Sequence, residues 1–222
     1  MKKFALVVAG GAGIRMGHPR PKQFLEIAGK PLLMHTLENF HRFDPVMELI
    51  VVLPEDHFSL WAELCEKQGF SLPCRLVKGG ETRFHSVKNG LSGIAGEGIV
   101  FIHDGVRPLV SEDTLQRCAV MALQQGNAIP VVPVSESVRW SDGKTSYPVD
   151  RSNLFLIQTP QTFRISLIRQ AYGQEYSPAF TDDASVLEKS GATIHLVEGN
   201  RENIKITWPS DLDYAEMILS TK

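Results

Sequence analysis

The sequence lacks most of the features that mark secreted and membrane proteins. Its three cysteines, Cys65, Cys74 and Cys118, form no C-x-x-C pair and have no zinc-site spacing. So sparse and odd a set fits a reducing compartment better than a disulfide-rich secreted domain. No stretch reaches 18 apolar residues, and the apolar run within residues 1–9 is too short for a signal peptide. We therefore expect a cytoplasmic protein with no membrane partner.

An excess of positive charge is also missing. The formal net charge is −2, whereas a general nucleic-acid binder is expected to be basic, so we expect no nucleic-acid partner and only a local anion site. Internal repeats, low-complexity tracts and linkers are absent from the sequence. The hydrophobic fraction of 43% and the charged fraction of 22% are ordinary for a globular protein. We expect one domain spanning residues 1–222, large enough to bury a substantial core.

Strand and helix patterns alternate along most of the chain. Strand patterns cover residues 4–9, 49–53, 74–77, 99–103, 128–134, 154–157, 192–197 and 203–207. Helix patterns cover residues 31–43, 56–68, 82–91, 111–125, 164–174, 182–190 and 209–220. This order predicts an α/β fold with a doubly wound, mostly parallel, Rossmann-like sheet. Ligands of such sheets bind outside the carboxyl ends of the strands.

The alternation breaks at about residues 135–153. Asp142 and Gly143 stand between two short mixed runs, which is a hairpin signal. A polar hairpin that contains Trp140 and Tyr147 has little core of its own. We expect a projecting β-hairpin arm that packs on the partner subunit of a homodimer, with a plain surface hairpin as the alternative.

A glycine-rich loop follows the first predicted strand and is the most distinctive stretch of the chain. Its four glycines are accompanied by three cations, the full set being Gly10, Gly11, Gly13, Arg15, Gly17, Arg20 and Lys22. Glycines let backbone N–H groups approach a ligand closely, and successive N–H groups form a concavity suited to anions. The loop therefore predicts a polyphosphate site. The alternative is an ordinary glycine-rich turn with solvated charges.

The loop differs from two common phosphate-binding loops. A P-loop needs a lysine directly after its last glycine, but His18 follows Gly17 here. The dinucleotide fingerprint G-x-G-x-x-G opens a helix, but here the glycines are spaced one residue too far. Pro19 and Pro21 also prevent a regular helix from starting at that point. This spacing speaks against one rival function, an NAD-dependent oxidoreductase.

The pattern A-G-G-x-G-x-R-M-G-x-x-x-P-K-Q-F in residues 9–24 resembles that of nucleotidyltransferases that use CTP. In particular, the chain resembles the 2-C-methyl-D-erythritol 4-phosphate cytidylyltransferase family of the non-mevalonate isoprenoid pathway. Sugar-1-phosphate and molybdopterin nucleotidyltransferases share the loop, but later motifs, as far as Leu212, narrow the resemblance. It implies that CTP and a sugar-alcohol phosphate are the substrates and that a divalent cation, Mg²⁺, is the cofactor. Ribitol-5-phosphate cytidylyltransferases share most of these motifs and remain the alternative.

The resemblance divides the nucleotide site between the first loop and a second glycine turn at residues 79–83. It implies that Arg15 and Lys22 are catalytic. The nucleotide-binding positions that it implies are Ala9, Gly10, Gly11, Ala12, Gly13, Gly80, Glu81 and Ser86. Without the resemblance, Ser86 is equally well read as an ordinary helix serine.

Asp104 is the candidate metal ligand. It follows a strongly apolar strand and faces the phosphate loop, and a carboxylate oxygen suits an ion that also binds phosphates. We expect its neighbour His103 to be a packing residue rather than a ligand. The family reads H-D-A-A-R-P here, and the substitution of Gly105 and Val106 leaves Asp104 and Arg107 in register.

The later motifs carry the acceptor site that the resemblance implies. Its positions are Arg107, Ser137, Arg151, Thr159, Thr181 and Lys205. Ser137 stands where the family commonly has threonine, and Arg151 is expected to reach the acceptor across the dimer interface. We expect Asp182 and Asp183 to be structural residues at a helix N-terminus.

Lys205 lies in a predicted strand between two isoleucines, so it points to the opposite face from them. A solvent-facing lysine is the ordinary reading of that pattern. The family pattern N-I-K-[IV]-T-x-P-x-D-L makes it an acceptor-phosphate contact instead. A nucleotide-sensing module without turnover is a further rival, but the cations Arg151 and Lys205 give one more anion site than a sensor needs.

Overall fold

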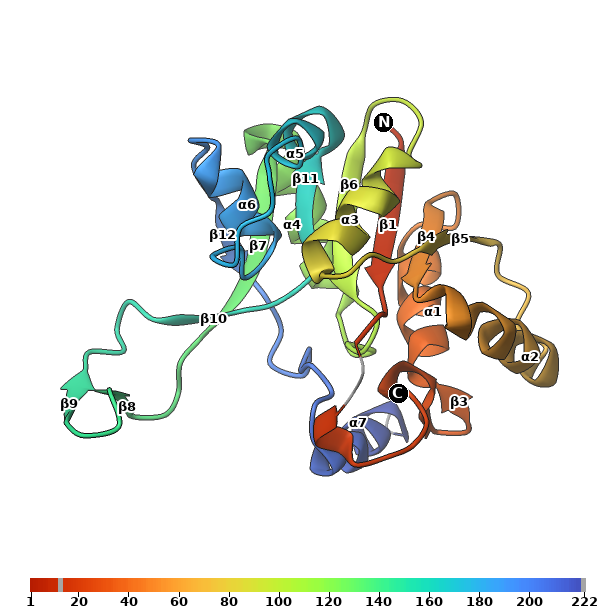
Figure 1. Ribbon diagram of the computed structural model, residues 1–222, viewed down its shortest axis with the longest axis horizontal. Helices are drawn as coiled ribbons and strands as arrows, with labels where there is room; N and C mark the ends of the chain where they lie inside the picture. Colours follow the sequence, from red (N-terminus) through yellow and green to blue (C-terminus); the bar gives the residue numbers. More distant parts are fainter. Residues whose placement is uncertain (12–13, 221–222) are drawn as a thin grey trace.

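A mostly parallel sheet forms the centre of the molecule in the computed structural model, which describes residues 1–11 and 14–220 (Figure 1). Strands β6, β1, β4 and β5 are mutually parallel, and β12 runs parallel to β7. Strands β10 and β11 are antiparallel to their neighbours. Across the sheet the order is β10 (Phe155–Ile157), β7 (Asn127–Pro133), β11 (Gln161–Arg164), β6 (Ile99–Asp104), β1 (Lys3–Val8), β4 (Glu48–Leu53) and β5 (Cys74–Lys78), with β12 (Leu196–Glu198) paired to β7.

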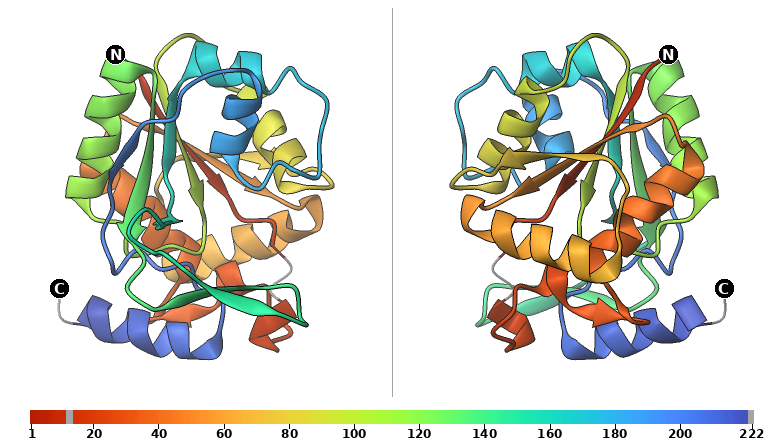
Figure 2. Two further views of the ribbon diagram at one scale, coloured as in Figure 1. Left: turned by 90° about the vertical axis from the view of Figure 1, so that its left-hand side faces the viewer. Right: turned by 90° about the vertical axis from the view of Figure 1, so that its right-hand side faces the viewer.

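Helices cover both faces of this sheet, as Figure 2 shows. One face packs against α1 (Leu32–Phe43), α2 (Phe58–Gln68) and α4 (Glu112–Gln125). The other face packs against α3 (Arg83–Ser92), α5 (Ile165–Ala171) and α6 (Asp183–Lys189). Successive side chains of β1 alternate between the two cores, with Ala5 in the first and Phe4 and Leu6 in the second. The predicted doubly wound α/β fold is confirmed.

Helix starts follow the capping residues in the sequence. The Ser111 hydroxyl accepts a hydrogen bond from the N–H of Thr114, and that of Thr82 accepts one from His85. Asp182 and Ser185 form a capping box at the start of α6. The structural reading of Asp182 is confirmed.

A third apolar cluster lies at the carboxyl edge of the sheet and involves α7 (Pro209–Ser220). Met16 from the glycine loop, Ile206 and Ala215 are buried in it. Figure 1 shows α7 below the sheet, next to the red segment that follows β1. This cluster therefore joins the beginning and the late part of the sequence. The short elements nearby are η1 (Ile14–Met16), η2 (Lys22–Phe24), β2 (Glu26–Ile27) and β3 (Lys30–Pro31), while η3 (Glu55–His57) precedes α2.

Three predicted elements differ from the structure. The strand predicted at residues 203–207 is wrong: the segment is irregular, and its apolar side chains enter the third cluster instead of a sheet. The strand predicted at residues 192–197 is shorter and starts later: only Leu196–Glu198 pairs with the sheet, as β12. The helix predicted from residue 164 begins at Ile165, after a strand, β11, that the sequence analysis missed.

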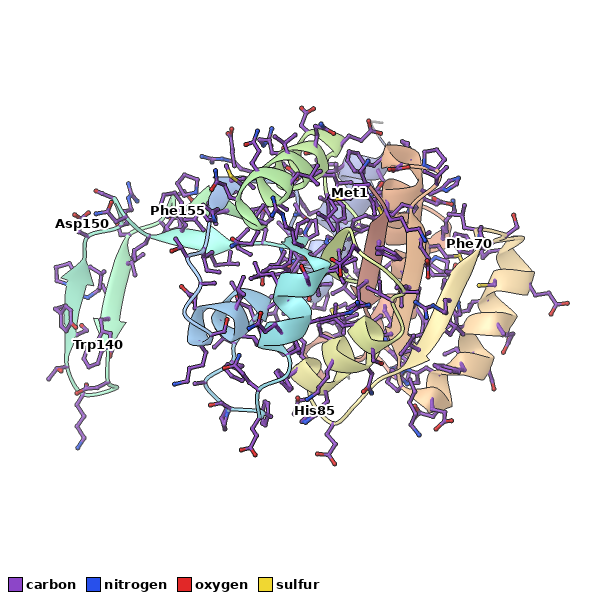
Figure 3. The ribbon with its side chains drawn as sticks, turned by 90° about the horizontal axis from the view of Figure 1, so that it is seen from above. Met1, Phe70, His85, Trp140, Asp150 and Phe155 are labelled. Carbon is purple, nitrogen blue, oxygen red and sulfur yellow. The ribbon has the colours of Figure 1, made fainter. Side chains whose placement is uncertain are left out.

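The predicted hairpin is present and projects from the body of the molecule (Figures 1 and 3). Strands β8 (Val138–Ser141) and β9 (Ser146–Val149) form a two-stranded sheet of their own. Trp140 and Tyr147 stack across it with ring centroids 5.1 Å apart, and both remain exposed. The structure therefore presents an arm whose aromatic side chains have no covering layer among the described residues.

A buried ion pair joins α3 to α6. Arg83 donates two hydrogen bonds, of 2.8 and 2.7 Å, to the two carboxylate oxygens of Asp183. The Tyr172 hydroxyl donates a third to the same carboxylate, at 2.6 Å. The Asp183 side chain is fully buried, whereas that of Arg83 is 30% exposed. The buried negative charge of Asp183 is therefore stabilised by Arg83 and Tyr172.

We expect Asp183→Asn to lower the free energy of unfolding by about 2–4 kcal/mol, because it removes the buried carboxylate that accepts two hydrogen bonds from Arg83 and one from Tyr172. Urea unfolding at pH 7 measures the loss. Asp213→Asn, which removes an exposed carboxylate from α7, is the matched control. Equal losses in the two variants, or no loss in Asp183→Asn, would contradict this account of the ion pair.

Candidate active site

A cavity of about 660 Å³ opens where four parallel strands end. Its walls include Val8 at the end of β1, Pro54 after β4, Gly79 after β5 and Asp104 at the end of β6. This is the edge at which the sequence predicted a ligand site. Many predicted site residues line the cavity, namely Ala9, Gly10, Gly11, Arg15, Lys22, Gly80, Glu81, Ser86, Asp104 and Lys205. Ala12 and Gly13 lie outside the described residues.

Asp104 lies where several cations converge. Lys205 Nζ is 3.1 Å and Arg107 Nε 3.2 Å from its Oδ2 atom, and Arg83 Nε is 3.7 Å from Oδ1. Burial would raise the pKa of this carboxyl, but the positive charges of Arg83, Lys205 and Arg107 outweigh burial and lower it. Asp104 is therefore an ionised carboxylate at neutral pH, and its side chain is only 11% exposed.

Lys22 is a buried lysine on η2, and its ammonium group donates a 3.1 Å hydrogen bond to the carbonyl of Ile206. Its pKa is lowered chiefly by burial and then by the charge of Lys205, while Asp104 acts in the opposite direction. Arg15 and Arg107 lower it further. The cavity thus concentrates like charges, which an anionic ligand would neutralise. Arg20, by contrast, lies on the surface, where a guanidinium nitrogen is 3.9 Å from a carboxylate oxygen of Glu26.

The second glycine turn is shaped by the start of α3. The Gly80 N–H donates a 3.1 Å hydrogen bond to the Ser86 hydroxyl. A Cβ atom at position 80 would lie 2.4 Å from the Cβ of His85, so only glycine fits there. The turn therefore lies close against its own helix and presents Gly80 and Glu81 to the cavity. Ser86 both lines the cavity and holds the turn.

The chemistry of the cavity fits Mg²⁺ bound together with phosphates. No group of three or more His, Cys, Asp or Glu side chains gathers as a metal cage within residues 1–11 and 14–220. Mg²⁺ commonly takes one or two carboxylates and completes its shell with water and substrate phosphates. The ionised, nearly buried Asp104 suits that role. The other requirement is a phosphate-bearing ligand beside it.

Two predicted acceptor residues lie behind the cavity wall rather than in it. Arg107 donates to Asp104 and, at 2.8 Å, to the carbonyl of Asn203. The Thr159 hydroxyl accepts the N–H of Asp104 at 3.1 Å and lies 3.0 Å from His103 Nδ1. Both residues therefore hold Asp104 in place.

Three other predicted acceptor residues do not line the cavity: Ser137, Arg151 and Thr181 are exposed. Arg151 donates a hydrogen bond to the carbonyl of Ser135 at the base of the arm. Within one chain the structure therefore does not bring these three together with Asp104.

Arg83 is a cavity residue to which the sequence analysis assigned no role. It lies between Asp104 and Asp183 and so connects the cavity to α6. Asp183 is 100 residues away in the sequence, and no local pattern signals such a pairing. The sequence also predicted no role for Gln158, which lies outside the cavity lining. Its side-chain amide donates to the carbonyls of Asn200 and Asn203 and so holds the late segment beside the cavity.

Known proteins resemble this chain over nearly its whole length. The family model of IspD, 2-C-methyl-D-erythritol 4-phosphate cytidylyltransferase, matches residues 4–221. The protein of that name from Bacteroides fragilis is 54% identical, over 99% of this chain and 100% of the relative. The crystal structure of the Thermus thermophilus protein has a TM-score of 0.79 and 31% identity, covering 99% of this chain and 100% of the other. That of 4-diphosphocytidyl-2C-methyl-D-erythritol synthase from Anaerococcus prevotii has a TM-score of 0.81 and 28% identity, covering 99% and 98%.

The packing role expected for His103 is confirmed. The residue is fully buried, its ring lies edge-on to Phe40 at 5.1 Å, and its Nε2 atom is 3.1 Å from the carbonyl of Arg107. Burial lowers its pKa from 6.5 to about 4, although the hydrogen bond to Arg107 opposes the shift. The folded protein therefore keeps this imidazole neutral in mild acid.

We expect His103 to make stability fall as the pH drops from 6.5 towards 4. Over that range the imidazole binds a proton in the unfolded chain but not in the folded chain. This difference lowers the free energy of unfolding by up to about 3 kcal/mol. The comparison is urea unfolding at several pH values for wild type and His103→Gln, and the variant should show the shallower dependence. Replacing the exposed His18 by Gln should leave the slope as it is. An unchanged slope in His103→Gln would show that this imidazole is not held neutral.

Proposed function

The chain belongs to the 2-C-methyl-D-erythritol 4-phosphate cytidylyltransferase family, and on that premise we propose that it transfers CMP from CTP to 2-C-methyl-D-erythritol 4-phosphate. The products are CDP-methylerythritol and pyrophosphate, and the reaction belongs to isoprenoid precursor biosynthesis. The observation that carries the proposal is the convergence of the glycine loop, Lys22, Lys205 and Asp104 on one cavity at the sheet edge. All the relatives named above are described by this activity or its product, which favours methylerythritol phosphate over ribitol 5-phosphate.

The reaction is an in-line displacement at the α-phosphorus of CTP. An oxygen of the acceptor phosphate forms the new bond to that phosphorus, and the bond to the bridging oxygen of pyrophosphate breaks. A phosphate dianion is already nucleophilic, so no general base is required. The main obstacle is anion repulsion, because two unit charges about 4 Å apart repel by roughly 4 kcal/mol at an effective dielectric constant near 20.

Arg15 and Lys22 would offset that repulsion. Both line the cavity on the side of the glycine loop. Lys22 is held by the Ile206 carbonyl before any ligand arrives, so it needs little reorganisation during the reaction. A bound triphosphate would also raise its lowered pKa and keep the ammonium charged. Positioning and electrostatic stabilisation are the usual means of catalysing phosphoryl transfer.

CTP would occupy the two glycine turns. Backbone groups of Ala9, Gly10, Gly11, Ala12 and Gly13 would bind its phosphates. Gly80, Glu81 and Ser86, at the other side of the cavity, would bind the cytosine. The divalent cation, when bound, would neutralise the phosphates and stabilise charge on the α-phosphoryl oxygens. Asp104 is the residue that would hold it.

The acceptor would bind between Lys205 and residues of a second subunit. The Lys205 side chain is 43% exposed, so it can contact a phosphate from solvent while Arg107 and Thr159 hold Asp104 from behind. Ser137, Arg151 and Thr181 complete the acceptor site in this proposal. The arm residue Arg151 does so across a homodimer interface.

Exposed apolar side chains support the dimer. They lie on the arm and on the strand after it, and comprise Trp140, Tyr147, Phe155, Leu156 and Ile157. Figure 3 shows the arm extending away from the body, with Trp140 and Phe155 marking its length.

No helix in the described part of the chain is long and apolar enough to cross a membrane. A cytoplasmic location completes the proposal.

We expect pyrophosphate release when the protein is mixed with CTP, Mg²⁺ and 2-C-methyl-D-erythritol 4-phosphate. Ribitol 5-phosphate in place of that acceptor should give little or no release, and chelation of the metal should stop the reaction. Turnover with ribitol 5-phosphate alone would move the protein to polyol-phosphate activation. No pyrophosphate release with either acceptor would overturn the proposed transfer.

Two variants of one loop sharpen this assay. Lys22→Ala should lower kcat by about 100-fold or more, the usual effect of removing one preorganised donor. Arg20→Ala removes an equal charge from the exposed part of the same loop and should stay within about twofold of wild type. A loss of less than about tenfold in a folded Lys22→Ala protein would contradict the central role of Lys22.

We expect the protein to sediment with twice the mass of one chain. Replacing both Trp140 and Tyr147 by Ala should shift the equilibrium towards monomer, because the arm then loses its apolar contact area. Met217→Ala, which removes an exposed apolar side chain from α7, should not. A monomeric wild type at assay concentration would remove the cross-subunit role of Arg151.

A further inference from the structure

Arg15 differs from the other cations of the cavity in its contacts. Lys22 is held by a backbone carbonyl, Lys205 by Asp104, and Arg83 by two aspartates. Among the residues that the structure describes, the Arg15 guanidinium has no hydrogen-bond or ion-pair partner. Its guanidinium lies instead over the indole ring of Trp208, 5.7 Å from the ring centroid. That distance lies within the range of a cation–π contact.

The backbone of Trp208 is fixed by hydrogen bonds, although the residue as a whole is 53% exposed. Its N–H and that of Thr207 donate to the same Asp211 carboxylate oxygen, at 2.8 and 2.7 Å. Ile206, two residues before Trp208, is buried in one apolar cluster with Met16, the neighbour of Arg15. Figures 1 and 2 show the first turn of α7 beside η1. The hydrogen bonds to Asp211 and the packing of Ile206 therefore hold the indole beside the glycine loop.

We propose that Trp208 is a positioning residue that holds Arg15 at the mouth of the cavity for the triphosphate of CTP. The inference rests on the proposed function, because it assumes that Arg15 binds that phosphate chain. Trp208 would act through Arg15 alone, without a substrate contact of its own.

The chemistry of stacking suits this role. The indole contacts the flat face of the guanidinium, whereas the N–H donors of arginine point outward in the plane of the group. A carboxylate partner would occupy those donors and would have to be displaced by phosphate. Stacking on Trp208 leaves them directed towards an incoming anion. The arrangement therefore orders the side chain without competing with the substrate.

Arg15 needs such support because its own loop offers little. The loop is rich in glycine, and Gly17 adopts a φ of +61° that favours glycine. A long side chain on an exposed turn loses conformational freedom when it binds a ligand. Contact with a fixed indole would reduce that loss. The gain would appear in the capture of CTP by the free enzyme.

Trp208→Leu tests the inference, because leucine keeps apolar bulk but removes the aromatic face. We expect kcat/KM for CTP to fall by about two- to fivefold, the range of an exposed cation–π contact. The dissociation constant for CTP, measured by titration without acceptor, should rise in the same proportion. Trp208→Phe should lose less, because it retains an aromatic ring. Tyr214→Leu, which removes an exposed aromatic residue from α7, should change neither quantity.

A double-variant comparison separates positioning from a general structural role. In an Arg15→Gln background, Trp208→Leu should cause no further loss of CTP binding, because the side chain that it positions is gone. An equal loss with and without Arg15 would overturn the inference, as would an unaffected Trp208→Leu protein or an equal loss in Tyr214→Leu. If wild type binds CTP but transfers nothing, the proposed function fails, and the binding titration still decides the role of Trp208.

Discussion

Repulsion between like charges is the constraint on which the site depends. The structure brings Lys22, Lys205, Arg83 and Arg107 around one carboxylate, Asp104, before any phosphate is present. Three of these cations are also held by a partner other than Asp104: Lys22 by the Ile206 carbonyl, Arg107 by that of Asn203 and Arg83 by Asp183. These contacts keep the charges assembled against their mutual repulsion. Burial, and after it the neighbouring cations, lower the pKa of Lys22, and a polyphosphate would offset the effect of those cations.

The fold supplies this arrangement by bringing distant parts of the chain to one edge of the sheet. The ends of β1, β4, β5 and β6 provide the floor of the cavity. The irregular segment at residues 203–207 closes its side and is held by the side-chain amides of Gln158 and Asn203 rather than by strand pairing. The third apolar cluster, which includes Met16 and Ile206, fastens that segment to the glycine loop. Packing of α7 and the geometry of the site are therefore coupled.

Local patterns in the sequence predicted much of this structure. The glycine loop, the second glycine turn and Asp104 each lie within a few residues of a strand end, so spacing alone placed them at one edge. The sequence did not reveal the Arg83–Asp183 pair or the contact of Arg15 with Trp208, because each joins residues far apart in the chain. The strand predicted at residues 203–207 failed for a related reason: alternating isoleucines indicate a buried face, but not whether a sheet or a helix buries it. Ser137, Arg151 and Thr181 lie outside the cavity of a single chain, so their roles still rest on the family resemblance.

The position of Ile206 and Lys205 late in the sequence has a consequence for synthesis on the ribosome. The strands that form the floor of the cavity are all translated before residue 105, and domains begin to fold as they emerge. The carbonyl that holds Lys22 and the ammonium that pairs with Asp104 arrive about one hundred residues later. A nascent chain can thus form part of its sheet while the charged cluster is still missing two members. The charged cluster is therefore complete only once translation has passed residue 206, so a shorter product would lack both Lys205 and the carbonyl that positions Lys22.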